Sequence, residues 1–217
     1  MFNRTIIHEL KQWKDSKDRK PLMMLGARQV GKTSVLKKFG EDCFDHCAYF
    51  SLDEEEGVCD IFRKTKNPLQ IIEQLSYLTS EPILPHHTLL ILDEIQDCPE
   101  AISAMKYFCE KTPEYAVACA GSLLGLAFGH QGFSFPVGKV DHMNMYPVTF
   151  SEFLEQRDAG LYQYYMSIDS LEPLPNVFFD RLSQAFTAYR ISGGMPAVAM
   201  KMIEKDLEGV ETTLRNI

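Results

Sequence analysis

The chain has 217 residues, of which 45% are hydrophobic and 24% are charged. This composition is ordinary for a globular protein, and the length suffices for one large domain or a main domain with a smaller appendage. The net charge of −8 argues against a domain that coats nucleic acid with a broad basic face. No apolar run approaches the roughly 20 residues that a membrane-spanning helix needs. With no signal-peptide pattern and no C-x-x-C pair among six cysteines, we expect a cytoplasmic protein with free thiols.

The first predicted element is a helix over residues 3–14, in which Ile6, Leu10 and Trp13 share one face. A short apolar strand at residues 22–25 follows it. This strand leads directly into a glycine-containing stretch, residues 26–33, which fits the pattern G-x-x-x-x-G-K-[ST]. A strand, such a loop and then a helix form the context of a phosphate-binding loop.

Each residue type in this loop has a physical role. Gly26 and Gly31 permit backbone angles that let successive N–H groups turn toward a phosphate, and the next helix directs its positive end at the same anion. Lys32 adds a charge for the β- and γ-phosphates, and the Thr33 hydroxyl is suited to Mg²⁺. The predicted nucleotide-binding residues are Gly26, Ala27, Arg28, Gln29, Val30, Gly31, Lys32, Thr33 and Ser34.

Further strands are predicted at residues 48–52, 88–92, 115–120 and 140–146. The run at 88–92 is continuously apolar, which is typical of a strand covered on both faces of a parallel sheet. Helices are expected between the strands, one of them starting at Asn67 and another capped reciprocally by Asp97 and Glu100. A loop is expected at 129–138. The alternation predicts an α/β fold with a parallel sheet between helices.

The sequence changes character at Pro147, after which only helices are predicted. Thr149 and Glu152 fit a capping box at the start of the first of them. In the clearest helix, residues 176–190, an aromatic and apolar stripe indicates a buried face formed by Phe178, Phe179, Leu182, Phe186 and Tyr189. We therefore expect an N-terminal helix and linker at 1–19, an α/β core at 20–146 and a helical domain at 147–217.

The apolar run at 88–92 ends in an acid pair, Asp93 and Glu94. Thr33 and Asp93 are suited to hold Mg²⁺, with Asp93 acting directly or through a metal-bound water. Glu94 is suited to orient the attacking water or to accept its proton. Ser122 ends the strand that we expect to lie between the strand before the phosphate-binding loop and the strand that ends in Asp93. There its hydroxyl could touch the γ-phosphate or the water. The predicted catalytic residues are thus Lys32, Glu94 and Ser122.

Six motifs stand in this order along the chain: GARQVGKT, LDEIQ, AGSLLG, FPVGK, YPVTFSEFL and GGMP. Together they resemble a bacterial and archaeal family of AAA+-type P-loop ATPases, whose members usually carry a C-terminal nuclease-like domain of unassigned function. The resemblance implies a sheet order of 5-1-4-3-2 followed by a small helical lid. It implies that Asp93 and Glu94 form the Walker B motif and that Ser122 is sensor 1. Gly194-Met195-Pro196 also resembles the lid motif of related signalling NTPases, which implies that Pro196 packs on the adenine, although a plain helix start explains this proline equally well.

Two features depart from the family pattern. Lys139 stands where a basic residue, often arginine, is expected near the fifth strand, and lysine lacks arginine's planar fork. A lysine is therefore less suited to act as an arginine finger. The other candidates for that role are Arg28, Arg157, Arg181 and Arg190. Family members also continue beyond the point where this chain ends. Either the chain is a fragment truncated before a further C-terminal domain, or that domain is absent.

The main hypothesis is ATP binding and Mg²⁺-dependent hydrolysis by an AAA+-type ATPase module, with ATP or ADP and Mg²⁺ as cofactors. The alternative is a nucleotide-dependent protein-interaction switch with slow turnover. A kinase is less favoured, because an Asp-Glu pair at a strand end favours activation of water. Self-association and a protein partner are left open, whereas direct nucleic-acid binding is not favoured and no membrane is expected. The process that the nucleotide serves is not readable from the sequence.

Overall fold

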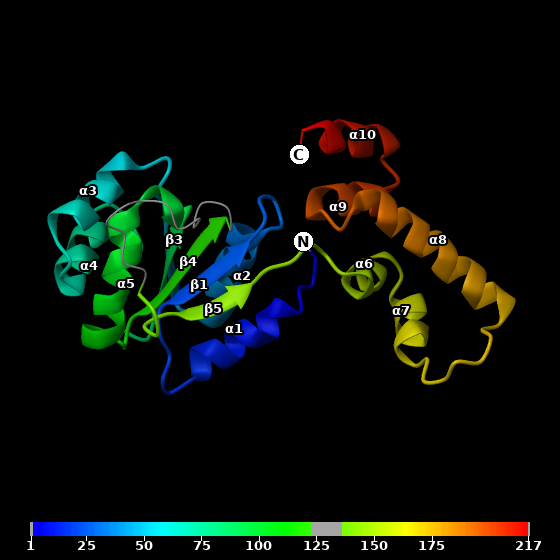
Figure 1. Ribbon diagram of the computed structural model, residues 1–217, viewed down its shortest axis with the longest axis horizontal. Helices are drawn as coiled ribbons and strands as arrows, with labels where there is room; N and C mark the ends of the chain where they lie inside the picture. Colours follow the sequence, from blue (N-terminus) through cyan, green and yellow to red (C-terminus); the bar gives the residue numbers. More distant parts are fainter. Residues whose placement is uncertain (1, 123–135, 217) are drawn as a thin grey trace. The chain divides into compact units, whose positions relative to one another are not determined.

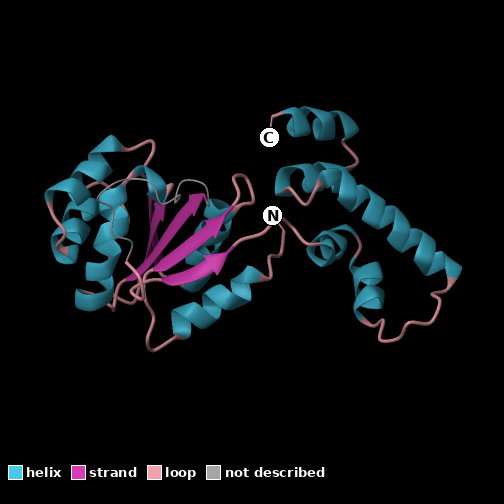
Figure 2. Ribbon diagram, in the orientation of Figure 1, coloured by secondary structure: helices cyan, strands magenta, loops and turns pink. Residues whose placement is uncertain are grey.

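The computed structural model describes residues 2–122 and 136–216, so most of the loop predicted at 129–138 lies outside the described residues. The chain divides into two compact units, Ile6–Met145 and Met1–Thr5 with Tyr146–Ile217. All described strands belong to the first unit, and the second is helical (Figure 2). No described helix is long and apolar enough to cross a membrane. The six cysteines, all of which are described, form no disulfide.

The described strands of the first unit are β1 (Leu22–Gly26), β2 (His46–Ser51), β3 (Thr88–Asp93), β4 (Ala116–Ser122) and β5 (Asp141–Asn144). They form one parallel sheet in the order β2-β3-β4-β1-β5 (Figure 1). Read from the other edge, this is 5-1-4-3-2, which confirms the predicted fold. The observed strand ends differ only slightly from the predicted ends. The apolar runs from which the strands were predicted are also the residues that the sheet buries.

Helices cover both faces of the sheet (Figure 1). They are α1 (Ile6–Asp15), α2 (Lys32–Cys43), α3 (Glu56–Lys64), α4 (Pro68–Ser76) and α5 (Pro99–Lys111). Side chains alternate along each strand, so Met23 and Leu90 pack with α3, α4 and α5. Met24 and Ile91 face the other way and pack with α1 and α2. Both faces are therefore apolar, which explains why the strand sequences are continuously apolar rather than alternating.

The parallel register brings the carboxyl ends of the strands to one edge. Gly26 at the end of β1 pairs with Ser122 at the end of β4. β3, which ends at Asp93, lies on the other side of β4. Ser122 therefore lies between the two motif strands, as predicted.

The reciprocal cap predicted for α5 does not form. Asp97 ends a short 3-10 helix, η1 (Ile95–Asp97), and its carboxylate accepts a hydrogen bond from Gln96. Cys98 is the N-cap of α5, and no side chain caps the helix. The prediction took Asp97 as the N-cap and was wrong by one residue. Pro99, whose φ is fixed, occupies the first helical position, so that Cys98 is the N-cap.

The helices of the second unit are α6 (Phe150–Arg157), α7 (Ala159–Met166), α8 (Asn176–Ser192), α9 (Pro196–Glu204) and α10 (Leu207–Arg215). The predicted capping box is present at the start of α6, where the Thr149 hydroxyl accepts from the Glu152 N–H and the Glu152 carboxylate accepts from the Thr149 N–H. Gly193, at a φ of 60°, ends α8, and Pro196 starts α9. The start of α9 at Pro196 agrees with the plain helix start that the sequence allows for this proline.

The aromatic stripe on α8 is only partly buried, contrary to the sequence prediction. Tyr189 packs against the rings of Phe150 and Phe153. Phe179 and Phe186, in contrast, are 57% and 46% exposed. The stripe is wider than the face that α6, α7 and α9 cover, and helical spacing alone does not reveal how much of a face is covered.

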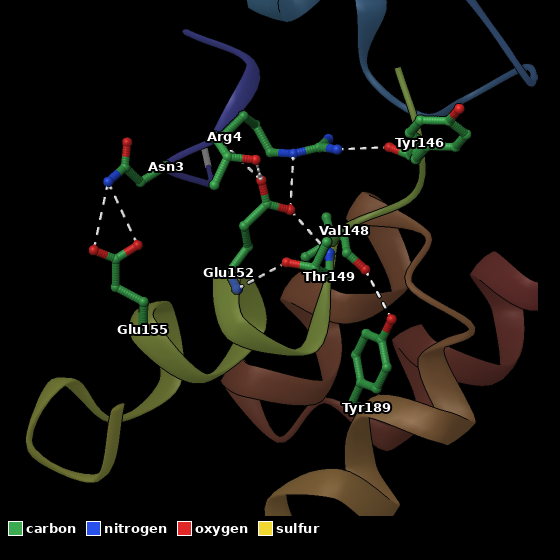
Figure 3. A network of polar contacts seen from close by, with 9 residues as sticks. Asn3, Arg4, Tyr146, Val148, Thr149, Glu152, Glu155 and Tyr189 are labelled. Carbon is green, nitrogen blue, oxygen red and sulfur yellow. Dashed lines mark hydrogen bonds and ion pairs between the residues drawn. The ribbon is translucent and has the colours of Figure 1, made fainter. Parts of the chain in front are cut away.

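Glu152 joins the first residues of the chain to α6 within the second unit (Figure 3). Its Oε1 accepts hydrogen bonds from the backbone N–H of Thr5 at 2.8 Å and from the Thr5 hydroxyl at 3.0 Å. Its Oε2 accepts from the Thr149 N–H at 2.9 Å and lies 3.3 Å from Nε of Arg4. Arg4 also donates to the Tyr146 carbonyl at 2.6 Å. The Arg4 and Glu152 side chains are only 6% and 3% exposed, so this is a buried ion pair with hydrogen-bonded partners.

Glu152→Ala is expected to destabilise the helical unit by about 3–5 kcal/mol, because it leaves the Arg4 guanidinium buried without its carboxylate. Burial raises the pKa of Glu152, but hydrogen bonds from Thr149 and Thr5 and the charge of Arg4 outweigh burial and lower the pKa below its ordinary 4.5. A lowered folded-state pKa adds stability above the unfolded-state value, which is lost as the pH falls through the folded-state value. The destabilisation should therefore shrink in acid.

Thermal unfolding of wild type and Glu152→Ala at about pH 7 and about pH 3 measures both effects. Glu155→Ala is the matched control, because the Glu155 carboxylate contacts only Asn3 in Figure 3, at 3.4 Å. Equal destabilisation by Glu152→Ala at both pH values would contradict the electrostatic account.

Candidate nucleotide-binding site

The loop between β1 and α2 has a backbone that requires glycine at two places. A Cβ at Gly26 would lie 2.3 Å from the carbonyl oxygen of Met145, so no larger residue fits. Gly31 has a φ of 93° and is the N-cap of α2, where no side chain caps the helix. Gln29 also adopts a positive φ of 63°. The first N–H groups of α2 thus receive no hydrogen bond from the N-cap residue, and N–H groups of this kind bind phosphate at helix N-termini.

Lys32 turns back over this loop. Its Nζ donates to the carbonyl oxygens of Gly26 at 3.1 Å and Ala27 at 2.9 Å, and the residue is only 7% exposed. Burial lowers the pKa of Lys32, while the nearby carboxylates of Glu94 and Asp93 act in the opposite direction. The ammonium group is thus held on the inner side of the loop, close to the acid pair.

The other predicted nucleotide-binding residues differ in exposure. Four are exposed on the loop or the first turn of α2: Ala27, Arg28, Gln29 and Ser34. Val30 is buried and packs in the core on the α1 and α2 side of the sheet. Pro196 lies in the other unit, at the start of α9. Its contact with adenine stays a prediction.

Thr33 and Asp93, the two predicted metal ligands, are in direct contact. The Thr33 hydroxyl donates to Oδ2 of Asp93 at 2.6 Å. The same oxygen accepts from the Tyr49 hydroxyl, on β2, at 3.1 Å. Burial, together with the charge of Asp93, raises the pKa of Tyr49 to about 12, so this hydroxyl remains a donor at neutral pH. A carboxylate beside a hydroxyl is the hard oxygen donor set that suits Mg²⁺, so the residues present fit this ion.

Glu94 and Ser122 lie at the same edge of the sheet. Glu94 has a φ of 48° and a ψ of 46°, which is uncommon for a residue with a side chain. Its N–H donates to Oδ1 of Asp93 at 3.0 Å. Nε2 of Gln96 donates to Oε2 of Glu94 at 2.6 Å, and Oε1 of Gln96 accepts from the Ser122 N–H at 3.3 Å. The predicted base and the predicted sensor are therefore connected through one side chain.

Two polar residues of this site, Tyr49 and Gln96, were not assigned a role from the sequence. A tyrosine within a strand is common, and nothing in its spacing marks it. Gln96 follows the acid pair in the LDEIQ motif, which is the only signal that could have indicated it.

Lys139 lies away from this site. It precedes β5, whose first residue, Asp141, pairs with Leu22 at the amino end of β1. The phosphate loop follows the opposite end of β1. Lys139 pairs with Glu110 on α5 at 2.9 Å. Of the predicted arginine-finger candidates, Arg28 is exposed on the loop, and the helical unit carries Arg157, Arg181 and Arg190.

A protein-family model described as an AAA domain matches residues 18–154, which is more than half of the chain. The chain belongs to the AAA domain family. The family model and the parallel sheet support a nucleotide-binding module of the AAA+ P-loop ATPase type. A comparison with curated proteins finds no match, and the nuclease-like domain that the motifs imply stays a prediction.

Solved structures share the fold at low sequence identity. Drosophila ORC bound to DNA is 13% identical, with a TM-score of 0.53 over 91% of this chain and 58% of that chain. The replication initiator DnaA, bound to AMPPCP and single-stranded DNA, is 16% identical, with a TM-score of 0.52 over 99% of this chain and 64% of that chain. The RuvB Holliday junction branch migration motor of Thermotoga maritima is 13% identical, with a TM-score of 0.50 over 94% of this chain and 61% of that chain. The chain thus spans less than two thirds of their lengths.

Proposed function

We propose that this AAA+ module binds ATP and hydrolyses it in the presence of Mg²⁺. The observation that carries the proposal is the 2.6 Å hydrogen bond from Thr33 to Asp93. Thr33 belongs to the first turn of α2, and Asp93 ends β3, two strands away from β1 in the sheet. A hydroxyl of the phosphate loop and an acid from a separate strand therefore meet where a nucleotide-bound cation needs ligands.

The remaining groups supply what phosphoryl transfer to water requires. The N–H groups of the loop and the ammonium of Lys32 bind and orient the β- and γ-phosphates. Thr33 and Asp93 would hold Mg²⁺, and the ion would supply neutralisation of the phosphate charge. Glu94 orients the attacking water or accepts its proton, and the Ser122 hydroxyl contacts the γ-phosphate or that water. DNA binding, self-association and protein partners stay outside this proposal.

Glu94→Gln tests the catalytic assignment. It should lower steady-state ATP turnover about 100-fold or more, because an amide cannot accept the proton of water. Nucleotide affinity should change little, because Glu94 lies beyond the phosphate loop. Turnover is measured by phosphate release with Mg²⁺ and with a chelator, and affinity by titration of a fluorescent ATP analogue.

Glu54→Gln, an exposed substitution in the acidic run after β2, is the matched control. Equal turnover in wild type and Glu94→Gln would remove the catalytic role of this residue. Tight nucleotide binding without turnover would favour a nucleotide-dependent interaction switch instead. Turnover that persists with the chelator would contradict the requirement for Mg²⁺.

A further inference from the structure

The side chain of Gln96 spans the distance between two elements of the site. Its Nε2 donates to Oε2 of Glu94 at 2.6 Å and to Oδ2 of Asp97 at 3.0 Å. Its Oε1 accepts from the backbone N–H of Ser122 at 3.3 Å. Both ends of the amide are therefore used, one on the segment after β3 and the other on the end of β4.

Gly121, the residue before Ser122, leaves room for the Gln96 side chain at the end of β4. A Cβ at Gly121 would lie 3.0 Å from Oε1 of Gln96 and 3.1 Å from the Cγ2 atom of Ile95. Both separations are tighter than ordinary van der Waals contact, so a Cβ at 121 would require Gln96 or Ile95 to shift by a few tenths of an ångström. Gly121 has no positive φ that would require glycine. The Gln96 side chain thus packs closely against the backbone at the end of β4.

Glu94 depends on external contacts for a defined orientation. It sits in the left-handed region, where a residue with a side chain is held by its surroundings rather than by its own preference. Its carboxylate can rotate about the single bonds of the side chain. A hydrogen bond that fixes one carboxylate oxygen therefore restricts the range of positions of the other oxygen. An amide donor can do this without a charge, whereas a lysine or arginine would form an ion pair with the carboxylate.

We propose that Gln96 is a positioning residue that holds the Glu94 carboxylate toward the attacking water and links it to the end of β4 at Ser122. This inference rests on the proposed ATPase function. It assigns to Gln96 an action through Glu94, because the Gln96 amide donates directly to the Glu94 carboxylate. Its loss should therefore lower kcat and leave KM nearly unchanged.

Gln96→Met keeps the length of the side chain and removes its three hydrogen bonds, to Glu94, Asp97 and Ser122. We expect kcat to fall about tenfold or more, because a misplaced reacting group is costly to rate, and KM for ATP to stay within about twofold. In a Glu94→Gln background the same change should cost less than about twofold further, because residues that act as a unit are not additive. Unchanged kcat, or losses that multiply, would overturn the proposal.

Gln96→Glu decides the question if Gln96→Met fails to fold. It retains the acceptor for the Ser122 N–H but replaces the donor that faces Glu94 with a second carboxylate, so kcat should again fall about tenfold. Gln163→Glu, an exposed substitution on α7 with the same charge change, is the control and should keep the wild-type kcat. A kcat for Gln96→Glu equal to that of the control would overturn the proposal.

A readout without turnover separates this inference from the ATPase proposal. The side-chain amide signal of Gln96 in a nitrogen-proton NMR spectrum, assigned with Gln96→Met, should shift in Glu94→Ala and stay in place in Glu54→Ala. Failure of the wild type to hydrolyse ATP would remove the proposed function and with it the effect on rate. If the wild type hydrolyses ATP but the Gln96 amide signal does not shift in Glu94→Ala, only the proposed role of Gln96 is overturned.

Discussion

Lys32→Ala is expected to weaken ATP binding by roughly 10- to 100-fold, which corresponds to the loss of a hydrogen bond to a charged group worth roughly 1.5–3 kcal/mol. The wild-type ammonium is largely buried and lies on the inner side of the loop, on the carbonyl oxygens of Gly26 and Ala27. The phosphates of a bound nucleotide can replace these neutral partners with charged ones. Alanine offers nothing to the phosphates, so turnover should be lost together with binding.

The fold should survive this substitution. Alanine is a favourable residue at the first position of α2, and the variant gives up two hydrogen bonds to loop carbonyls that water can replace, each worth about 1 kcal/mol. Thermal unfolding with and without ATP and Mg²⁺ measures both points, because a ligand that binds only the folded state raises the melting temperature. Lys38→Ala, on the same helix but half exposed and paired with Asp42, is the control. An equal rise in melting temperature in wild type and Lys32→Ala would contradict the role of this lysine.

The sheet and the phosphate loop could be predicted because their signals are local. Gly26 and Gly31 mark backbone positions that exclude side chains, and the structure shows the reason at each: a carbonyl 2.3 Å from a Cβ at Gly26, and a φ of 93° at Gly31. The apolar run at 88–92 predicts a strand covered on both faces, and β3 is buried throughout. Strand order followed from the family resemblance, since apolar periodicity does not specify which strands are neighbours.

Contacts between strands could not be predicted in the same way. Tyr49 reaches Asp93 because β2 pairs with β3 in a register that places Ser51 opposite Asp93, and register is a property of the assembled sheet. Gln96 reaches Ser122 because η1 turns the chain back toward β4. Lys139 lies next to the fifth strand, as expected, but before β5 begins, so it is at the amino ends of the strands and away from the site. The contacts of Tyr49 and Gln96 depend on strand register and on the path of a turn, neither of which leaves a pattern in the sequence.

Asp93→Asn is expected to lower Mg²⁺-dependent turnover at least about 100-fold, which is roughly 3 kcal/mol of transition-state stabilisation. Asparagine keeps the shape of the side chain and an oxygen that can accept from Thr33 and Tyr49. It lacks the negative charge with which a carboxylate attracts a hard cation. ATP binding measured with a chelator should change little, because in the proposed site the loop N–H groups and Lys32, and not Asp93, contact the phosphates.

Turnover measured across a range of Mg²⁺ concentrations separates charge from hydrogen bonding at this carboxylate. Tyr49→Phe removes one of the two hydroxyl donors to Oδ2 and should cost about 1 kcal/mol, or roughly fivefold, because the charge and the Thr33 contact remain. Asp53→Asn, an exposed substitution just after β2, should behave as wild type. If Asp93→Asn reached half of its maximal rate at the wild-type Mg²⁺ concentration, Asp93 would not bind the metal. The direct contact between Asp93 and Thr33 would then serve only to hold β3 against the phosphate loop.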